Sequence, residues 1–566
     1  MNKKTGIPIL AAVIVAAGAY FIFTYTNEDF TPQEALVDQA EKSVSAKEVD
    51  YKYPPTPVVD TLMKKQKKVE QQILKESEGS TFSDPYINLD PYNRSPLSAL
   101  IVFETEEEAE VTFTVKSKNG DADITKTIHN LKTQHQLPVL GLYPNFENTV
   151  VIEARTESGK TMKNTVTIKT SELPEYIPEI NIKTLKKDLV EMPENGLTFA
   201  VPSTKYPYGF DLNGDIRWYS SEYNSHVFKQ LENGNFIFLG KDSNRGKTYN
   251  RLFEINLMGK IYNAFKISAE PAHSEAKGME KTLIHHDISE LPSGNLVLTV
   301  HDDDGEYLED TMIVIDRQTG DILKEFDLKN LFPKDVYENF ENDGEENATD
   351  WFHQNSVVYD ESDTSLIISG RNQDAVMKID YETGDVIWTL AHPEGWSDAY
   401  EKYLIKGQGE DFKYPGGQHD PTILPDFDNN PDTIDLLIYD NNVVVTRGDE
   451  ELSEQFSAAT HYRINEETLE AEVIWTYGKE RGPEYFTNII GSAKYMQESG
   501  NILVDFGWVD EGKRSHIVEV TEDEEPKVVF EAVATDFPKG AWVYRSQRYS
   551  LYPDTWERRY WISNEE

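Results

Sequence analysis

The ten residues HDISELPSGN, positions 286–295, recur in altered form along the chain and decide its fold. The related segments are HVFKQLENGN (226–235) and SAKYMQESGN (492–501), and each places the glycine of a Gly-Asn turn eight residues after its first residue. His353 and His419 open two further repeats, in which the turns differ. A side chain that holds one position in successive repeats converges on one axis when the repeats close into a ring. We therefore expect histidines that are distant in sequence to share one pocket.

A second pattern, a turn of small residues followed by an apolar or aromatic strand, marks the other end of each unit. Its six copies are NGDIRWY (213–219), MGKIYNAF (258–265), TGDILKEF (319–326), TGDVIWTL (383–390), EAEVIWTY (470–477) and EPKVVFEA (525–532). Their spacing of roughly 45 to 90 residues suits the blades of a β-propeller with variable loops. Six closing strands predict six blades, and a seven-bladed count stays open. The first unit lacks its own opening strand, which AWVYRSQRYSLY (541–552) at the C-terminal end can supply.

The fold class that these patterns predict is all-β. Residues 81–178 hold short runs rich in β-branched residues, among them EVTFTVKS and NTVVIEART, separated by turn signals. They predict a small β-sandwich, which precedes a six-bladed propeller over residues 190–566. Residues 27–80 are expected to form a stalk. Its segment LMKKQKKVEQQILKESE has apolar residues near helical spacing and predicts a solvated or packing helix.

Residues 1–26 have the composition of a membrane segment. Lys3 and Lys4 precede a charge-free apolar run from Gly6 to Phe23, which is at the short end for a membrane span. We expect a single N-terminal anchor with the rest of the chain on the extracytoplasmic side. A signal peptide cleaved near Ala19 is the alternative. The chain has no cysteine, so disulfides, thiolate metal ligands and a lipidated cysteine are excluded.

The charge balance restricts the partners. The formal net charge of −45 argues against nucleic acid, because its phosphates would be repelled. The same charge does nothing to attract an anionic substrate, so any anion site has to be built locally.

The histidine register points to one mouth of the predicted channel. In a propeller the opening strand of each blade is innermost, and residues at its start lie at one opening. Arg371 follows SLIISG, in the strand expected to pair with the one that His353 opens. A guanidinium is a planar donor suited to oxyanions, so sulfate, phosphate or carboxylate groups are the expected ligands. The residues expected at this mouth are His226, His286, His353, His419 and Ser492.

Metal binding is the main structural alternative for such a histidine ring. Imidazoles on facing strands bind zinc readily, and the carboxylates of HDDDGE (301–306) are suitable calcium ligands. The fixed positive charge of Arg371 opposes a cation, however. We therefore predict no metal and no cofactor.

Four motifs give the chain a specific resemblance. DWFHQNS (350–356), SGRNQD (369–374), GGQHD (416–420) and HHD (285–287) together resemble the bacterial arylsulfate sulfotransferases. Members of that family are exported enzymes that move a sulfuryl group from one phenol to another without a nucleotide sulfate donor. The resemblance covers about residues 81–566 and implies a phenolic sulfate donor, a phenol acceptor, no cofactor and a homodimer.

Carried over residue by residue, the resemblance makes His419 of GGQHD the nucleophile, which becomes transiently sulfated. His286, His353 and Arg371 match residues that hold the sulfuryl oxygens and assist proton transfer. The HHD motif does not decide whether His285 or His286 matches the family's catalytic histidine. The alignment of HDISEL with HDPTIL favours His286. Neighbouring strand residues face opposite ways, so His285 is expected to pack between blades.

Four further residues are predicted near the substrates. Asn355 shares a strand face with His353 and is expected to orient an imidazole or the sulfuryl group. Tyr485 is one of several aromatic residues expected to stack on a phenol ring. His226 and Ser492 keep the register of the catalytic histidines, and His226 either lines the acceptor path or fills the channel structurally.

Two other functions stay open on the sequence. One is a surface-exposed propeller that binds anions or glycans without catalysis. The other is a sulfate ester hydrolase, in which water replaces the phenol acceptor. The family's enteric members carry a cysteine pair in the loop before the nucleophile, which is residues 396–415 here, and this chain has none.

Overall fold

The computed structural model describes residues 57–566 apart from 121, 204, 242–248, 267–282, 302–306, 341–348, 411, 449, 452, 538–541, 556–560 and 564–566. Strands dominate this part of the chain, which confirms the all-β class. The predicted anchor (1–26) lies outside the described residues, as does most of the predicted stalk. Among the helices that are described, none has the length and apolar character needed to cross a membrane.

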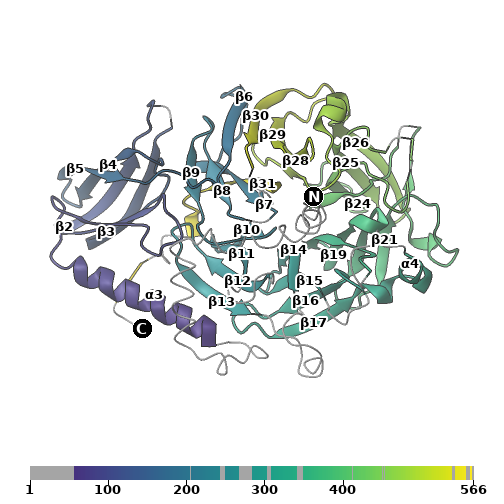
Figure 1. Ribbon diagram of the computed structural model, residues 1–566, viewed down its shortest axis with the longest axis horizontal. Coiled ribbons are helices and arrows are strands. Elements are labelled where there is room, and N and C mark those ends of the chain that lie inside the picture. Colours follow the sequence, from purple (N-terminus) through teal and green to yellow (C-terminus); the bar gives the residue numbers. More distant parts are fainter. Residues whose placement is uncertain are drawn as a thin grey trace, which may run out of the picture.

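Six sheets of mainly antiparallel strands follow one another around a common centre (Figure 1). Sheet 1 contains β31 (Val543–Ser550), β7 (Gly196–Pro202), β8 (Tyr208–Phe210) and β9 (Ile216–Tyr219). Sheet 2 contains β10 (Phe228–Gln230), β11 (Phe236–Lys241), β12 (Tyr249–Ile255) and β13 (Ile261–Lys266). Sheet 3 contains β14 (Leu283–Glu290), β15 (Leu296–His301), β16 (Thr311–Ile315) and β17 (Ile322–Asp327).

The other three sheets lie further along the chain. Sheet 4 contains β18 (Gln354–Asp360), β19 (Ser365–Gly370), β20 (Ala375–Asp380) and β21 (Val386–Leu390). Sheet 5 contains β23 (His419–Ile423), β24 (Thr433–Asp440), β25 (Ala458–Asn465) and β26 (Glu470–Tyr477), with β22 (Lys406–Gly407) at its edge. Sheet 6 contains β27 (Ser492–Tyr495), β28 (Ile502–Val509), β29 (Arg514–Val520), β30 (Val528–Thr535) and β6 (Glu179–Leu185).

Short helices occupy the connections between these sheets. They are η3 (Leu328–Leu331), α4 (Lys334–Glu338), η4 (Arg371–Gln373), η5 (Glu401–Tyr403) and η6 (Lys479–Tyr485).

Both repeat patterns correspond to regular positions in the sheets. The Gly-Asn turns join the first strand to the second in sheets 2, 3 and 6. Their glycines Gly234, Gly294 and Gly500 have φ values of 82°, 81° and 73°, which is a backbone region that favours glycine. The six segments predicted to close each unit fall on β9, β13, β17, β21, β26 and β30.

The first and last strands of the ring close it together. β31 pairs with β7 from Val543 opposite Pro202 to Ser550 opposite Gly196. This confirms that the C-terminal segment supplies the opening strand of the first unit. β6 adds to the outer edge of sheet 6 by pairing with β30, so the ring begins at Glu179, before the predicted boundary at residue 190. Each pairing covers an edge that would otherwise be open.

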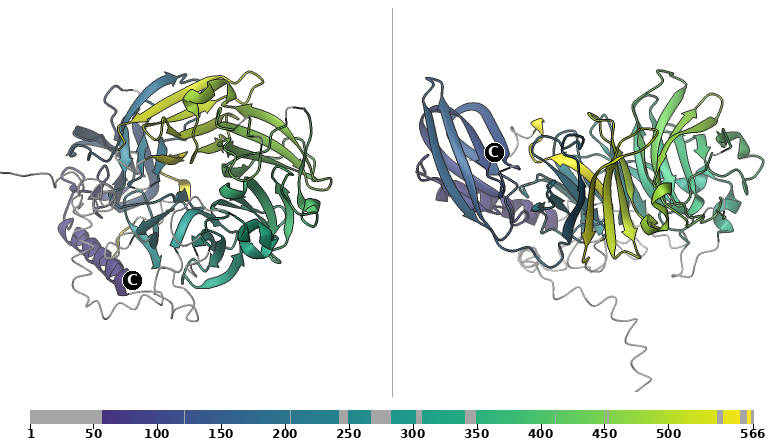
Figure 2. Two further views of the ribbon diagram at one scale, coloured as in Figure 1. Left: turned by 45° about the vertical axis from the view of Figure 1, so that its right-hand side comes forward. Right: turned by 90° about the horizontal axis from the view of Figure 1, so that it is seen from above.

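The first strands of successive sheets are the inner ones. β14 contacts β18, β18 contacts β23, β23 contacts β27, and β27 contacts β31. Apolar side chains fill the spaces between sheets, as where Leu437 and Tyr439 of sheet 5 pack with Val504 and Phe506 of sheet 6. The left view of Figure 2 shows the sheets arranged around this centre.

Residues 81–178 form a separate β domain, at the left of Figure 1. Its strands are β1 (Tyr86–Leu89), β2 (Ala99–Val115), β3 (Ile124–Val139), β4 (Glu147–Thr156) and β5 (Thr161–Lys169). Their hydrogen bonds join them into one five-stranded sheet. The predicted β-sandwich would consist of two sheets. The reason is the length of β2, which pairs with β3 on one side and with both β1 and β4 on the other.

Helix α3 (Pro57–Glu76) confirms the predicted helical segment. The helix packs on the body: the Gln66 side chain donates to the Ile261 carbonyl at 2.8 Å and accepts from its N–H at 2.9 Å. Ile73 is buried, and Glu70 pairs with Lys260 at 2.9 Å. These contacts attach α3 to β13 of sheet 2.

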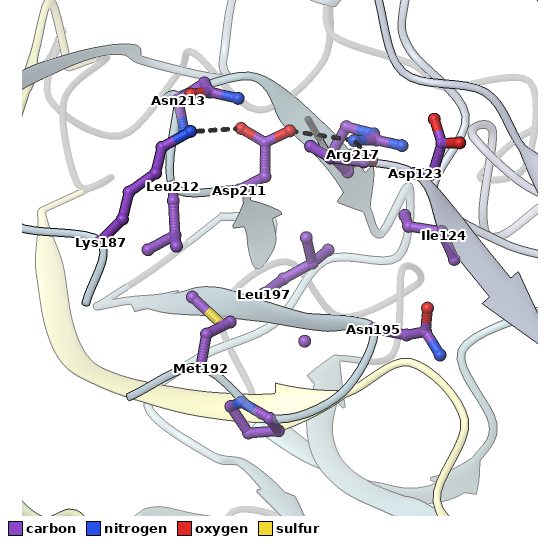
Figure 3. Close-up of a pocket in the computed structure, with 13 residues that line it drawn as sticks. Asp123, Ile124, Lys187, Met192, Asn195, Leu197, Asp211, Leu212, Asn213 and Arg217 are labelled. Atoms are coloured by element: carbon purple, nitrogen blue, oxygen red, sulfur yellow. Dashed lines mark hydrogen bonds and ion pairs between the residues drawn. The ribbon is translucent and has the colours of Figure 1, made fainter. Parts of the chain in front are cut away.

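Arg217 of β9 joins the N-terminal domain to sheet 1. Its side chain is fully buried and donates to Asp211 Oδ2 at 2.9 Å, to Tyr143 Oη at 2.9 Å and to the Gly141 carbonyl at 2.8 Å. A cavity of about 330 Å³ lies at this junction, where Figure 3 shows Asp211 between Lys187 and Arg217.

Candidate active site

The structure brings the predicted histidines together at the centre of the ring. The His226 and His286 rings stack with centroids 4.7 Å apart, and His286 meets His353 edge to face at 4.7 Å. Tyr544 lies between them and the nucleophile candidate, with its ring centroid 4.6 Å from that of His226 and 6.2 Å from that of His419. These five side chains come from sheets 2, 3, 4, 5 and 1. The convergence predicted from the register is therefore confirmed, while the catalytic roles stay predictions.

Tyr544 was not found from the sequence. It lies on β31, the strand that closes the ring, and its side chain is buried. Its hydroxyl donates to the Asn355 carbonyl at 3.3 Å. Because the closing strand is the innermost strand of sheet 1, Tyr544 reaches the centre as the histidines do. The signal that could have found it is the position of AWVYRSQ in the missing opening strand.

His419 is the first residue of β23, and its contacts fix its tautomer. Nδ1 lies 2.7 Å from Asn441 Oδ1 and 3.1 Å from the Gly417 carbonyl oxygen. Both partners are acceptors, so Nδ1 carries the proton and Nε2 carries the lone pair. Burial and the charge of Arg371 hold the pKa of His419 well below its usual range, although Asn441 opposes the shift. His419 is thus a neutral imidazole with a nucleophilic nitrogen.

Asn441 is held in the orientation that His419 requires. Its amide NH2 donates to the Thr487 carbonyl at 2.9 Å and to the Ile490 carbonyl at 2.9 Å, which leaves Oδ1 to face the imidazole. Asn441 directly follows β24, and a single asparagine in a connection carries no periodic signal. Sequence reasoning therefore missed it.

His353 lies between two carboxylates. Its Nδ1 is 2.5 Å from Asp350 Oδ2 and 3.0 Å from Glu309 Oε2. Burial by itself would lower the pKa of His353, but the carboxylates of Glu309 and Asp350 outweigh burial and raise it to about 10. His353 is therefore an imidazolium at neutral pH. Glu309 was also missed, because it stands in the connection before β16, outside either repeat pattern.

His285 does not pack between sheets as predicted. Its Nδ1 lies 2.9 Å from Nδ1 of His286, and both side chains are buried. The reason is a bulge in β14: Ile284 pairs with Val300 and Ile288 with Leu298, so three residues stand opposite one. A bulge breaks the alternation of strand faces, which brings both imidazoles to the same place.

Burial dominates the protonation of the other two histidines of the cluster. It holds the pKa of His286 well below the usual value, although Glu309 opposes the shift. It also lowers the pKa of His226 to about 3. Both rings are neutral at neutral pH, in contrast to His353.

Arg371 begins η4, immediately after β19, and its backbone N–H donates to the His353 carbonyl at 3.2 Å. The predicted pairing of the two strands is thus confirmed. Its guanidinium donates to Asn372 Oδ1 at 2.9 Å and to the Asn488 carbonyl at 3.3 Å. Burial lowers the pKa of Arg371, but a guanidinium stays charged at neutral pH.

The motif residues that carry no proposed chemistry hold the others in place. Gln418 Nε2 donates to the Ala375 carbonyl at 2.9 Å, and the Gln418 carbonyl accepts from Asn355 Nδ2 at 2.6 Å. Asp374 Oδ1 accepts from the backbone N–H of Gly417 at 2.8 Å. The segments that bear His353, Arg371 and His419 are thereby hydrogen-bonded to one another. Asn355 is fully buried, and substrate contact through it stays a prediction.

Ser492 and Tyr485 are not brought to this cluster. Ser492 Oγ accepts from the Ser546 N–H at 3.1 Å and links β27 to β31. Tyr485 Oη donates to Glu531 at 2.7 Å, and its ring lies 4.4 Å from that of His516. No contact among the described residues joins either side chain to the four histidines. A short serine side chain does not reach the axis, and Tyr485 is turned towards another cluster.

Among the described residues, three groups of side chains place potential metal ligands within 4.8 Å of one another. One is Asp426, Asp428 and Asp435, and the other two both include Glu309. The first of these two adds Asp350 and His353, whose 2.5 Å contact is a hydrogen bond. The ligand atoms of a tetrahedral zinc ion lie about 3.3 Å from one another, because each bond to the metal is about 2.0 Å long. The two atoms of the Asp350–His353 contact are closer together than that. The other adds His285 and His286, and its spacing does permit a cation. Asp302 to Asp304 of the predicted calcium loop lie outside the described residues.

Comparisons with known proteins agree with the motifs. The family model described as Arylsulfotransferase (ASST) matches residues 160–545, and the Arylsulfotransferase Ig-like domain matches residues 86–171. The arylsulfate sulfotransferase AssT of Escherichia coli O6:H1 is 24% identical over 530 residues, which cover 74% of this chain and 84% of that protein. The AssT protein of Lelliottia amnigena is 24% identical, over 77% of this chain and 88% of its own.

Solved structures add little to this assignment. A putative 6-phosphogluconolactonase from Bacteroides fragilis aligns with a TM-score of 0.34 at 10% identity, over 79% of this chain and 99% of that one. The family model, in contrast, matches more than half of the chain and includes each of the four motifs and the closing residue Tyr544. The chain belongs to the arylsulfotransferase family.

Proposed function

We propose that this protein is an arylsulfate sulfotransferase that moves a sulfuryl group from a phenolic sulfate ester to a phenol through a sulfohistidine on His419. The transfer is ping-pong and uses no nucleotide sulfate donor. Family membership supports the reaction. The observation that carries the mechanism is the state of His419: buried, neutral, with Nδ1 committed to two acceptors and with Arg371 close by.

The finer description of the fold belongs to the same proposal. We take the six sheets as the blades of a six-bladed β-propeller, with the first strand of each sheet facing the channel. The single sheet of residues 81–178 corresponds to the Ig-like domain that the family carries. His226, His286, His353, His419 and Tyr544 then line one mouth of the channel.

In the first half-reaction His419 Nε2 attacks the sulfur atom in line with the bond to the phenol oxygen. The new S–N bond forms as the S–O bond breaks, and the electron pair of that bond stays on the phenol oxygen. Arg371 and His286 hold the non-bridging oxygens as charge develops. Sulfate monoesters carry a charged, poorly electrophilic sulfur, so this neutralisation is the main requirement on the site.

His353 is the group best suited to give the departing phenol oxygen its proton. Its pKa of about 10 is close to the roughly 10 of a phenol hydroxyl, so a proton passes in either direction at little cost. Neutral His353 then takes the proton of the acceptor phenol, whose oxygen attacks the sulfur. The S–N bond breaks, its electron pair returns to His419 Nε2, and the starting state is restored.

The test is turnover of p-nitrophenyl sulfate with and without added phenol, in the wild type and in His419→Ala. We expect nitrophenol release that depends on phenol and disappears in the variant. Intact-protein mass spectrometry without acceptor should detect one sulfuryl group on the wild type only. Release that ignores phenol would identify a hydrolase. A folded protein without release or labelling would favour an anion-binding module.

The cellular setting is proposed from the sequence. The N-terminal segment of residues 1–26 tethers the protein to the membrane with its catalytic region on the extracytoplasmic side. The family resemblance adds a homodimer to this proposal. Membrane fractionation with sequencing of the mature N-terminus distinguishes an anchor from cleavage near Ala19. Sedimentation of the protein without its apolar run gives the oligomeric state.

A further inference from the structure

We propose that Glu309 is a positioning residue that contacts the pair His286 and His353, from two neighbouring sheets, and so keeps on His353 the proton that the departing phenol oxygen takes. Its removal then makes turnover depend on the basicity of the departing phenolate. The inference rests on the proposed function and deepens it, because neither the motifs nor the histidine register assigns any role to this carboxylate.

The Glu309 carboxylate lies between the two imidazoles. Its Oε2 is 3.0 Å from His353 Nδ1 and 3.6 Å from His286 Nδ1. Its side chain is 22% exposed, so water screens these contacts only in part. Of these two histidines, Asp350 contacts only His353, which it precedes by three residues in sequence. Glu309 is therefore the described carboxylate that reaches both members of the pair.

The backbone around Glu309 is attached to the segment that carries His353. The Glu309 carbonyl accepts from the N–H of Gln354 at 3.1 Å, and the Leu308 N–H donates to the Thr349 carbonyl at 2.9 Å. Glu309 has a φ of 51°, a left-handed conformation that surrounding structure has to maintain in a non-glycine residue. Bonds on both sides of the residue thus hold its side chain in place.

The neighbouring carboxylate, Asp310, also bonds to the segment that carries His353. Trp351 Nε1 donates to Asp310 Oδ2 at 2.9 Å, and Trp351 is fully buried. The connection before β16 belongs to sheet 3, yet its hydrogen bonds go to the segment that opens sheet 4. This arrangement positions a carboxylate across the boundary between two sheets.

The chemical consequence follows from the nitrogen that Glu309 contacts. A carboxylate at Nδ1 stabilises the imidazolium form and directs the Nε2–H of His353 away from itself, as the carboxylates that orient catalytic histidines do. The pKa of Glu309 lies well below its usual range, since the histidines outweigh burial, so it stays ionised. The titratable groups that interact with His353 are Glu309, Asp350, His226, His286 and His419. Arg371 contacts it through the backbone, where its N–H donates to the His353 carbonyl.

The experiment compares two donors in Glu309→Gln, a substitution that keeps the shape and removes the charge. General acid catalysis is worth about 10²-fold or more when the leaving group is basic. We expect turnover of 4-methylphenyl sulfate to fall by about 10²-fold. Turnover of p-nitrophenyl sulfate should fall far less, because p-nitrophenolate leaves without a proton.

Glu522→Gln is the matched control. Glu522 Oε1 lies 2.9 Å from Nδ1 of the buried His461, and its side chain is 18% exposed. This pair has the chemistry of the Glu309–His353 contact at a place outside the histidine cluster. Both donors should turn over in this variant as they do in the wild type.

Equal slowing of both donors by Glu309→Gln would show a merely structural role and overturn the proposal. Loss of wild-type activity in EDTA with recovery in zinc would overturn it too, because Glu309 would then be a metal ligand. Nitrogen NMR of the imidazoles separates this proposal from the proposed function. His353 should stay protonated at pH 8 in the wild type and lose its proton in Glu309→Gln, whether or not either donor is turned over.

Discussion

Asn441 shows how much of a histidine's chemistry is set by its neighbours. His419 has an acceptor on each side of Nδ1, and the acceptor from Asn441 is fixed because both of its N–H groups are engaged. An imidazole that lost this partner would populate both tautomers. Only the tautomer with a free lone pair on Nε2 can attack sulfur from that atom.

We predict that Asn441→Ala slows formation of the sulfohistidine by about 10- to 100-fold, the usual effect of losing a residue that orients a functional histidine. Single-turnover rapid quench with p-nitrophenyl sulfate measures this step directly. The Gly417 carbonyl still accepts from Nδ1, so activity is reduced and not abolished. Unchanged single-turnover rates in a folded variant would show that the tautomer is set without Asn441.

The protonation states predict an unusual dependence of activity on pH. His419 must be neutral, and its lowered pKa keeps it so until the pH falls well below 6.5. His353 must be protonated to supply the leaving group, and it loses its proton as the pH rises through about 10. We expect kcat/KM for 4-methylphenyl sulfate to stay level across the neutral range and to fall only near these limits. A limb centred near pH 6.5 would contradict this assignment.

At the scale of elements, β31 has both a structural role and a role in the candidate site. It supplies the inner strand of sheet 1 by pairing with β7, and it carries Tyr544 into the histidine cluster. Arg545 follows on the same strand and binds Asp287 at 2.7 Å and the Asn355 carbonyl at 2.9 Å. The strand that completes the fold therefore also completes the site.

Substitutions of Tyr544 separate these two contributions. Tyr544→Phe removes one hydroxyl bond to a backbone carbonyl and should cost about 1 kcal/mol of unfolding free energy, with the ring cluster intact. Tyr544→Ala leaves a cavity at the centre and should cost about 3 to 5 kcal/mol. Denaturant unfolding measures both values. Similar losses in the two variants would mean that the ring packs less tightly than its 4.6 Å contact with His226 indicates.

Elements were predicted well wherever the pattern repeats. The six closing segments fall on strands of six different sheets, and the C-terminal segment pairs where an opening strand was missing. The prediction failed where a local irregularity matters. The bulge at residues 285 to 287 places His285 beside His286, and the long β2 joins residues 81–178 into one sheet. Neither feature leaves a periodic signal.

At the scale of the whole molecule, charge and function point in opposite directions. The net charge of −45 repels anions, yet Arg371 and His353 present two cations within a partly buried cluster. Burial makes local charges count for more than distant, solvated ones. The proposed site is therefore suited to a sulfate ester although the net charge of the chain is negative.

The sequence by itself determined the all-β class, the strand repeats, the closing strand and the histidines that meet at the centre. The strands and the histidines recur at fixed positions, and such repetition is visible along one chain. Only the tertiary structure decided the partners of those histidines. Asn441, Glu309 and Tyr544 occupy connections or the last strand, and each reaches the cluster from a different sheet. Protonation and tautomer depend on such contacts across space, which spacing along the chain does not encode.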